Sequence, residues 1–193
     1  MSLGALREAL RAHGGTVAAL VDGGEPAKDP LELGGAARRR VGDGPGREAP
    51  QPGEGAPQRA ARGPRTNARA AEYELLLEMI LEGSLLHYGT PRVVVTEDRD
   101  LALLLGDQLY ALGLARLAEI GDLDSVNELA DLISLLSQAQ LGGDETLARA
   151  VWEAGAAAIG WGSSPALEAA KELARAGDAA AASALLQSAG REL

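Results

Sequence analysis

Two strongly apolar segments, residues 73–88 and 101–120, constrain this chain more than any other feature. Leucine, isoleucine and methionine fill many positions of the first segment, and leucine and alanine dominate the second. The first segment is apolar nearly all round, which is typical of a helix buried on several sides. We therefore expect two long helices that face each other, with the rest of the chain packed on them.

The sequence after these segments repeats one pattern, in which glycine ends a helix and Asp or Ser opens the next. Asp and Ser cap helix N-termini with their side-chain oxygens, and glycine adopts the left-handed conformation that often ends a helix. The candidate N-caps along the chain are Asp98 or Asp100, Asp122 or Asp124, Asp144 and Ser164. Short connections favour antiparallel neighbours, so residues 70–193 are predicted to form an all-α, antiparallel helical bundle.

The first 69 residues divide into two parts. Leu3, Leu6 and Leu10 share one helical face, so residues 1–33 are predicted to contain a short helical segment. In residues 34–69, 13 of the 36 residues are Gly or Pro, and Val41 is the one large aliphatic residue. Such a composition buries too little apolar surface to offset the entropy of ordering, so we expect a disordered linker.

Charge and cysteine content narrow the classes of function. Residues 70–193 carry 20 acidic and 7 basic side chains, and an acidic surface repels phosphate backbones, so we expect no nucleic-acid partner. The chain has no cysteine, which excludes disulfides and thiolate metal sites. No continuous apolar run reaches the length of about 20 residues that a membrane span needs. We expect a cytoplasmic protein without a membrane span.

Several stretches in order resemble the trans-isoprenyl diphosphate synthase (polyprenyl synthetase) family. The stretch 77–87, LEMILEGSLLH, resembles the family helix that carries its first aspartate-rich motif, and 105–109, LGDQL, is similar to the core of the next family helix. The stretch 153–164, EAGAAAIGWGSS, looks like the family's helix of small residues. The resemblance spans about 72–178 and implies part of the isoprenoid synthase fold.

The aspartates that carry this family's chemistry are missing. Tyr88 and Gly89 stand where the family has its first aspartate pair, and Asp178 is followed by alanines where the second motif belongs. In the family, those aspartates hold the Mg²⁺ ions that neutralise a departing diphosphate. The resemblance therefore implies a degenerate, truncated and non-catalytic member, a pseudoenzyme with neither metal nor cofactor.

Three polar residues near the two apolar helices are candidates for lining a cavity: His87, Asp107 and Gln108. By resemblance, Asp107 would face a diphosphate, but a hydrogen-bonded structural role with His87 or Gln108 is the favoured explanation. The acidic cluster Glu97–Asp100 contains Arg99, so helix capping accounts for it better than a metal site.

Two classes of function remain open. The first is a regulatory or small subunit that associates with a catalytic prenyl synthase or with a second copy of itself. The second is a helical interaction module unrelated to isoprenoids, suggested by the pattern L-A-x-x-G-D at 117–122 and at 173–178. A lipid-binding bundle without catalysis is a further alternative. Stacked helix pairs would favour the interaction module, and a bundle around a cavity would favour the isoprenoid reading.

Overall fold

The computed structural model describes residues 3–21 and 55–190, and the regular elements in these ranges are helices. The predicted all-α class is therefore confirmed. The elements are α1 (Leu3–His13), α2 (Gly15–Leu20), α3 (Ala56–Ala60), a 3₁₀ turn (Asn67–Arg69), α4 (Ala70–Tyr88), α5 (Arg99–Ile120), α6 (Leu123–Gly142), α7 (Glu145–Trp161), α8 (Pro165–Arg175) and α9 (Ala181–Gly190).

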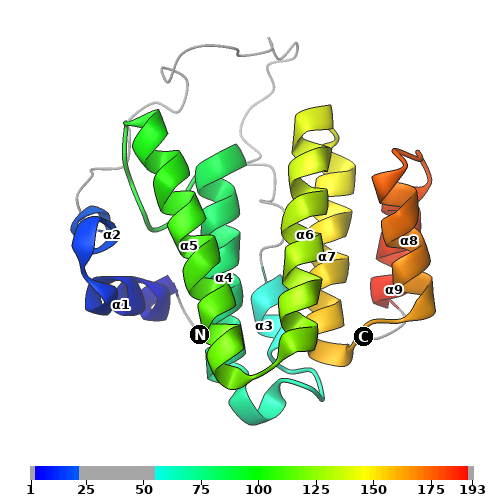
Figure 1. Cartoon of the computed structure of the whole chain (residues 1–193), viewed down its shortest axis with the longest axis horizontal. Helices are drawn as coiled ribbons and strands as arrows, with labels where there is room; N and C mark the ends of the chain where they lie inside the picture. The colour runs from blue at the N-terminus through cyan, green and yellow to red at the C-terminus, as the bar shows by residue number, and fades with distance from the viewer. Residues whose placement is uncertain (1–2, 22–54, 191–193) are drawn as a thin grey trace, which may run out of the picture.

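The long helices of the described part form three antiparallel hairpins that stand in a row: α4 with α5, α6 with α7, and α8 with α9 (Figure 1). The short helix α3 packs against both α4 and α7, and the pair α1–α2 lies at the end of the row beside α4 and α5. The molecule is thus a row of helix pairs in two layers.

The caps lie where the residue types predicted them. The side chains of Asp98, Asp122, Asp144 and Ser164 accept hydrogen bonds from backbone N–H groups in the first turns of α5, α6, α7 and α8. Gly121 and Gly143 end α5 and α6 with φ of 82° and 69°, a conformation that glycine adopts without strain. The chain direction therefore reverses at residue types that can be recognised in the sequence.

The repeated pattern L-A-x-x-G-D is a helix-ending device in both places. In the first stretch, the N–H groups of Gly121 and Asp122 donate to backbone carbonyls in the last turn of α5, at Leu117 and Ala118. In the second stretch, the N–H of Gly177 donates to the Ala174 carbonyl and the N–H of Asp178 to the Leu173 carbonyl. The aspartate that follows each glycine accepts from a later backbone N–H, Ser125 or Ala180. Local capping is a sufficient reason for the resemblance between the two stretches.

Two apolar cores hold the described residues together. The larger core joins the helices from α3 to α9 and includes Trp152, which is 1% exposed. The smaller core lies between the pair α1–α2 and the side of α4 and α5 that this pair covers, around Met79, Leu86 and Leu109. Helix α4 contributes to both cores, which explains why its sequence is apolar on nearly every side.

The segment 55–69, which we expected to be part of a disordered linker, is instead packed into the larger core. Ala56, Ala60 and Ala61 are at most 2% exposed, and a Cβ atom on Gly63 would lie 2.2 Å from the Gly160 carbonyl oxygen. The backbones of Gly63 and Gly160 are in direct contact, which requires small residues. The number of large aliphatic side chains in the segment therefore does not predict its packing. The remainder of that predicted linker, residues 34–54, lies outside the described residues, as do 22–33 and 191–193.

Candidate functional site

His87, at the end of α4, lies in an aromatic cluster between α4 and α5. Its ring stacks on Tyr110, with centroids 5.3 Å apart and an angle of 8° between the planes. The ring also lies against the backbone of α5, because a Cβ on Gly106 would be 2.6 Å from His87 Nε2. Tyr110 donates a hydrogen bond to Ser84, and burial raises the pKa of Tyr110 to about 12. The cluster therefore fixes the end of α4 on α5.

The structure brings two of the three predicted site residues together. His87 Nε2 lies 3.1 Å from Asp107 Oδ1, but this nitrogen makes no hydrogen bond within the described part of the chain, so the pair is close without being aligned. The Asp107 side chain is 70% exposed, which leaves its charge mostly hydrated. Gln108 faces the N-terminal helix, with Nε2 3.4 Å from His13 Nε2.

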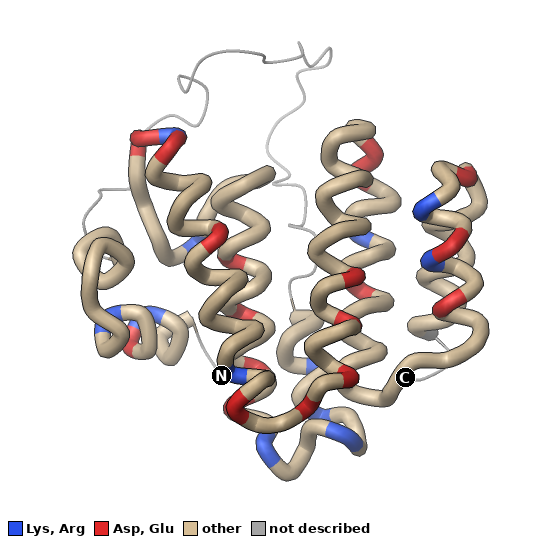
Figure 2. Tube along the Cα trace, viewed as in Figure 1, with Lys and Arg blue, Asp and Glu red and all other residues tan. Residues whose placement is uncertain are grey.

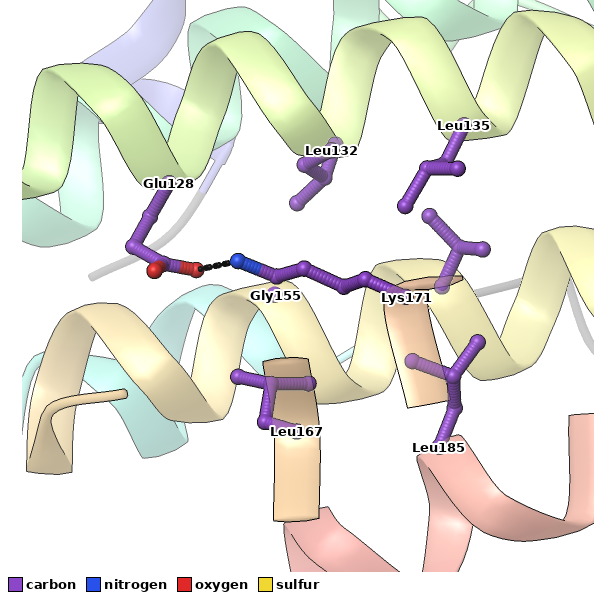
Figure 3. A pocket seen from close by; sticks show the side chains of 8 residues that line it. Glu128, Leu132, Leu135, Gly155, Leu167, Lys171 and Leu185 are labelled. Carbon is purple, nitrogen blue, oxygen red and sulfur yellow. Dashed lines mark hydrogen bonds and ion pairs between the residues drawn. The ribbon is translucent and has the colours of Figure 1, made fainter. Parts of the chain in front are cut away.

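A second cluster, which sequence reasoning did not predict, surrounds Lys171 on α8. Its ammonium group donates to Glu128 (2.8 Å) and Asp131 (3.1 Å) on α6, and to Glu168 (3.0 Å) on α8. Arg175, one turn after Lys171 on α8, also donates a hydrogen bond to Asp131. Figure 3 shows the Lys171 side chain running beside Gly155 toward Glu128. This network joins the second hairpin to the third.

The electrostatics of the Lys171 network favour a structural role over a catalytic one. The Lys171 side chain is 4% exposed, and burial lowers its pKa, but the hydrogen bonds that it donates to Glu128 and Glu168 outweigh burial and leave the pKa raised. A lysine that acts as a nucleophile or base needs a lowered pKa, so that its amine is free near neutral pH. Lys171 is therefore held as a cation.

The interior beside Lys171 is nearly filled. The void bounded by α6, α7, α8 and α9 has a volume of about 10 Å³, which is room for one water molecule at most. A larger hollow of about 240 Å³ is open to solvent and is lined by Arg69, Glu72, Arg116, Glu119 and Ile120. His87, Asp107 and Gln108 line neither space.

Glu82 on α4 is a buried carboxylate that orders the loop after α4. It is 0% exposed and accepts hydrogen bonds from the backbone N–H groups of Arg92, Val93 and Val94 at 2.7–3.1 Å, while the Arg92 side chain lies 3.3 Å away. Arg92 also donates to Glu78, one turn earlier. The spacing of Glu74, Glu78 and Glu82 by four residues in an otherwise apolar helix is a signal that could have identified this polar edge.

Asp and Glu positions follow the long helices, whereas Lys and Arg positions gather on α1, in the loop between α3 and α4 and on α8 (Figure 2). In that loop, Arg65 lies 3.3 Å from Asp122 and 3.5 Å from Asp124, and Tyr73 donates to Asp122 at 2.6 Å. Burial and the hydrogen bond to Asp122 raise the pKa of Tyr73 to about 12. Within residues 3–21 and 55–190, no group of three His, Asp or Glu side chains has the arrangement of metal ligands.

Helix α5 is apolar in overall composition, and the rest of the described molecule leaves one of its faces open. Among the described helices it is the one long and apolar enough to cross a membrane by length and composition, with a mean hydropathy of 1.3 over its most apolar 18 residues. Residues that are buried make up 28% of that window. Its outer face consists of Asp100, Leu104, Asp107, Ala111, Ala115 and Ala118, all exposed, with Leu104 at 66%. Such a helix alone is weak support for a membrane span, because helices of water-soluble proteins pass the same test.

No protein-family model, no curated protein and no solved structure matches the chain.

Proposed function

We propose that this chain is a non-catalytic helical protein that acts by binding another polypeptide along the outer face of α5. The observation that carries the proposal is the mismatch between the apolar character of α5 and its low burial. Apolar surface left in water is unfavourable. On this face Leu104 and three alanines lie exposed beside Asp100 and Asp107, a mixture of apolar and charged groups that suits contact with another polypeptide. Alanine at three positions of this face also lets a partner helix approach closely.

The arrangement of the titratable groups supports binding over catalysis. Lys171 is held as a cation among carboxylates, His87 is stacked between Tyr110 and the backbone of α5, and Glu82 is used by the loop after α4. Each group thus stabilises a contact between elements. The void of about 10 Å³ is far smaller than an isoprenoid or acyl chain, which counts against the lipid-binding alternative.

The sequence resemblance suggests the first partner to test. A chain that retains helices similar to those of isoprenyl diphosphate synthases, with Tyr88 and Gly89 in place of the first aspartate pair, would suit a small or regulatory subunit of such an enzyme. The row of helix pairs and the filled interior favour an interaction module outside isoprenoid metabolism, and a second copy of the chain could also occupy the same face. These alternatives change the partner and leave the binding face unchanged.

Photocrosslinking in the native cell tests the proposal. A photoreactive amino acid replaces Leu104 on α5 in one variant and Leu186 on α9, at the far end of the row, in the control. We expect a discrete crosslinked protein from position 104 and none from position 186, with its identity determined by mass spectrometry. An isoprenyl synthase would support the subunit role, and a doubled mass would identify a homo-oligomer. Crosslinking to lipid alone, or equal products from both positions, would overturn the proposal.

A further inference from the structure

The N-terminal helices α1 and α2, here called the N-terminal arm (residues 3–21), occupy an apolar groove on the first hairpin. Leu6, Leu10, Val17 and Val21 of the arm are at most 4% exposed. The groove that receives them is formed by residues of α4, α5 and the loop between them: Met79, Leu86, Val93, Val94, Ala102, Leu105 and Leu109. An amphipathic helix in an apolar groove is a common mode of peptide recognition.

The contacts of the arm are mainly apolar. Its polar contacts include Arg7 Nη2 to the Arg92 carbonyl at 3.2 Å, Val95 N–H to the Leu20 carbonyl at 3.2 Å, and the His13–Gln108 approach at 3.4 Å. Each of these lies at the long end of hydrogen-bond distances, and the groups involved can bond to water instead. Apolar packing therefore makes a large part of the attachment of the arm to the first hairpin.

The arm can also leave without opening the larger core. None of its residues belongs to the larger core, which joins the helices from α3 to α9. Elements with few buried contacts open at a lower free energy than the whole molecule.

We propose that the groove between α4 and α5 is a helix-binding site, that the N-terminal arm is its reversible occupant, and that an amphipathic helix with the same leucine spacing from another chain competes for it. This inference does not depend on the outer face of α5, because the groove lies on the side of the hairpin that the arm covers. In the closed state the arm blocks the site, so occupancy by a partner requires its release.

The absence of cysteine in the chain makes the proposal testable by thiol labelling of the full-length protein. Val17→Cys places a single thiol in the arm, and Val151→Cys places one in the larger core as a matched control, since the two valines are 0% and 3% exposed. Under native conditions we expect Val17→Cys to be labelled at least about tenfold faster, which corresponds to opening of the arm that is about 1.4 kcal/mol easier than opening of the core. Val21→Cys serves as a second reporter if Val17→Cys lowers the thermal midpoint.

A synthetic peptide of residues 1–21 then tests binding in trans. We expect it to accelerate labelling of Val17→Cys up to a plateau and to leave Val151→Cys unchanged. A peptide with Leu6→Asp and Leu10→Asp is the control and should have no effect. Equal labelling rates at the two positions would show that the arm opens only with the whole molecule and would overturn the proposal. Fast labelling that the peptide leaves unchanged would also overturn it, because local fraying of α2 would then explain the rate.

Discussion

At the scale of single residues, buried charges carry the contacts between helices. Lys171 and Glu82 are 3% and 0% exposed, and each is surrounded by the partners that a buried charge requires. Neither role follows from the sequence alone, because the partners of Lys171 on α6 lie 40 and 43 positions earlier in the chain. The proximity of His87 and Asp107 could be predicted from the sequence, because both lie on helices that were expected to face each other.

Replacement of Lys171 by methionine tests the network at its centre. Lys171→Met keeps most of the side-chain volume but leaves Glu128, Asp131 and Glu168 without their shared cation. Removal of one partner from a buried ion pair costs about 3 kcal/mol or more, so we expect a loss of that size in the free energy of unfolding, measured with urea. The control Arg175→Met removes a pair that is 35% exposed and should cost about 0.5 kcal/mol. Equal losses in the two variants would contradict the structural role of Lys171.

The same network should make the free energy of unfolding depend on pH. Burial raises the pKa of Asp131, but hydrogen bonds from Lys171 and Arg175 outweigh it and leave the pKa lowered, and the hydrogen bond from Ser163 lowers that of Glu168. A carboxyl whose pKa is lower in the folded state stabilises the protein above its unfolded pKa, about 4, and loses this contribution as the pH falls through the folded pKa.

We therefore expect the difference in unfolding free energy between wild type and Lys171→Met to be largest at pH 7 and to shrink as the pH falls, with a further loss below about pH 4. Urea unfolding at pH 7, 5 and 3 measures it. A difference that stays the same at pH 3 would mean that Asp131 and Glu168 gain nothing from Lys171.

At the scale of elements, the helices of the body were predictable and the segment before them was not. The ends of α5, α6, α7 and α8 follow from local capping chemistry, which acts within a few residues and can be read directly from residue types. The segment 55–69 packs through glycine and alanine, so its order depends on a surface of α7 that is distant in sequence. Gly83 approaches α5 closely and Gly155 approaches Leu132 closely, which only small residues inside these apolar helices allow.

Gly63→Ala tests whether the backbone contact between this segment and α7 contributes to the fold. The added Cβ would lie 2.2 Å from the Gly160 carbonyl oxygen, and both groups are backbone, so the segment must shift. We expect a loss of about 2 kcal/mol or more in unfolding free energy. Gly142→Ala is the control, because its Cβ meets no atom within 4 Å, and it should remain within about 0.5 kcal/mol of wild type. If both variants were equally stable, the packing of 55–69 on α7 would be refuted.

Glu82→Gln tests the anchoring of the loop after α4. The amide keeps one acceptor oxygen but loses the charge that strengthens the hydrogen bonds from Val93 and Val94. We expect about 2 kcal/mol of destabilisation and faster hydrogen exchange at those two amides. The control is Glu72→Gln, whose side chain is 54% exposed. Unchanged exchange at Val93 and Val94 would rule out Glu82 as the anchor of this loop.

At the scale of the whole molecule, three hairpins in a row bury two cores and leave the outer face of α5 open. The apolar composition of α5 contrasts with its low burial, and this contrast is what points to a partner. Leu104 is the clearest example of this contrast on α5, because it is large, apolar and 66% exposed. If α5 is the binding face, a partner must cover this surface in the cell.

The most direct test is the native mass of the protein in a gentle extract of its own cells, measured by size exclusion with light scattering. We predict that the wild type elutes in an assembly heavier than its 19.8 kDa chain, that Leu104→Glu elutes at the mass of the single chain, and that Leu141→Glu, which changes an exposed leucine at the end of α6, behaves as wild type. A wild-type mass of one chain, or an assembly that Leu104→Glu leaves intact, would contradict the proposal that α5 is the binding face.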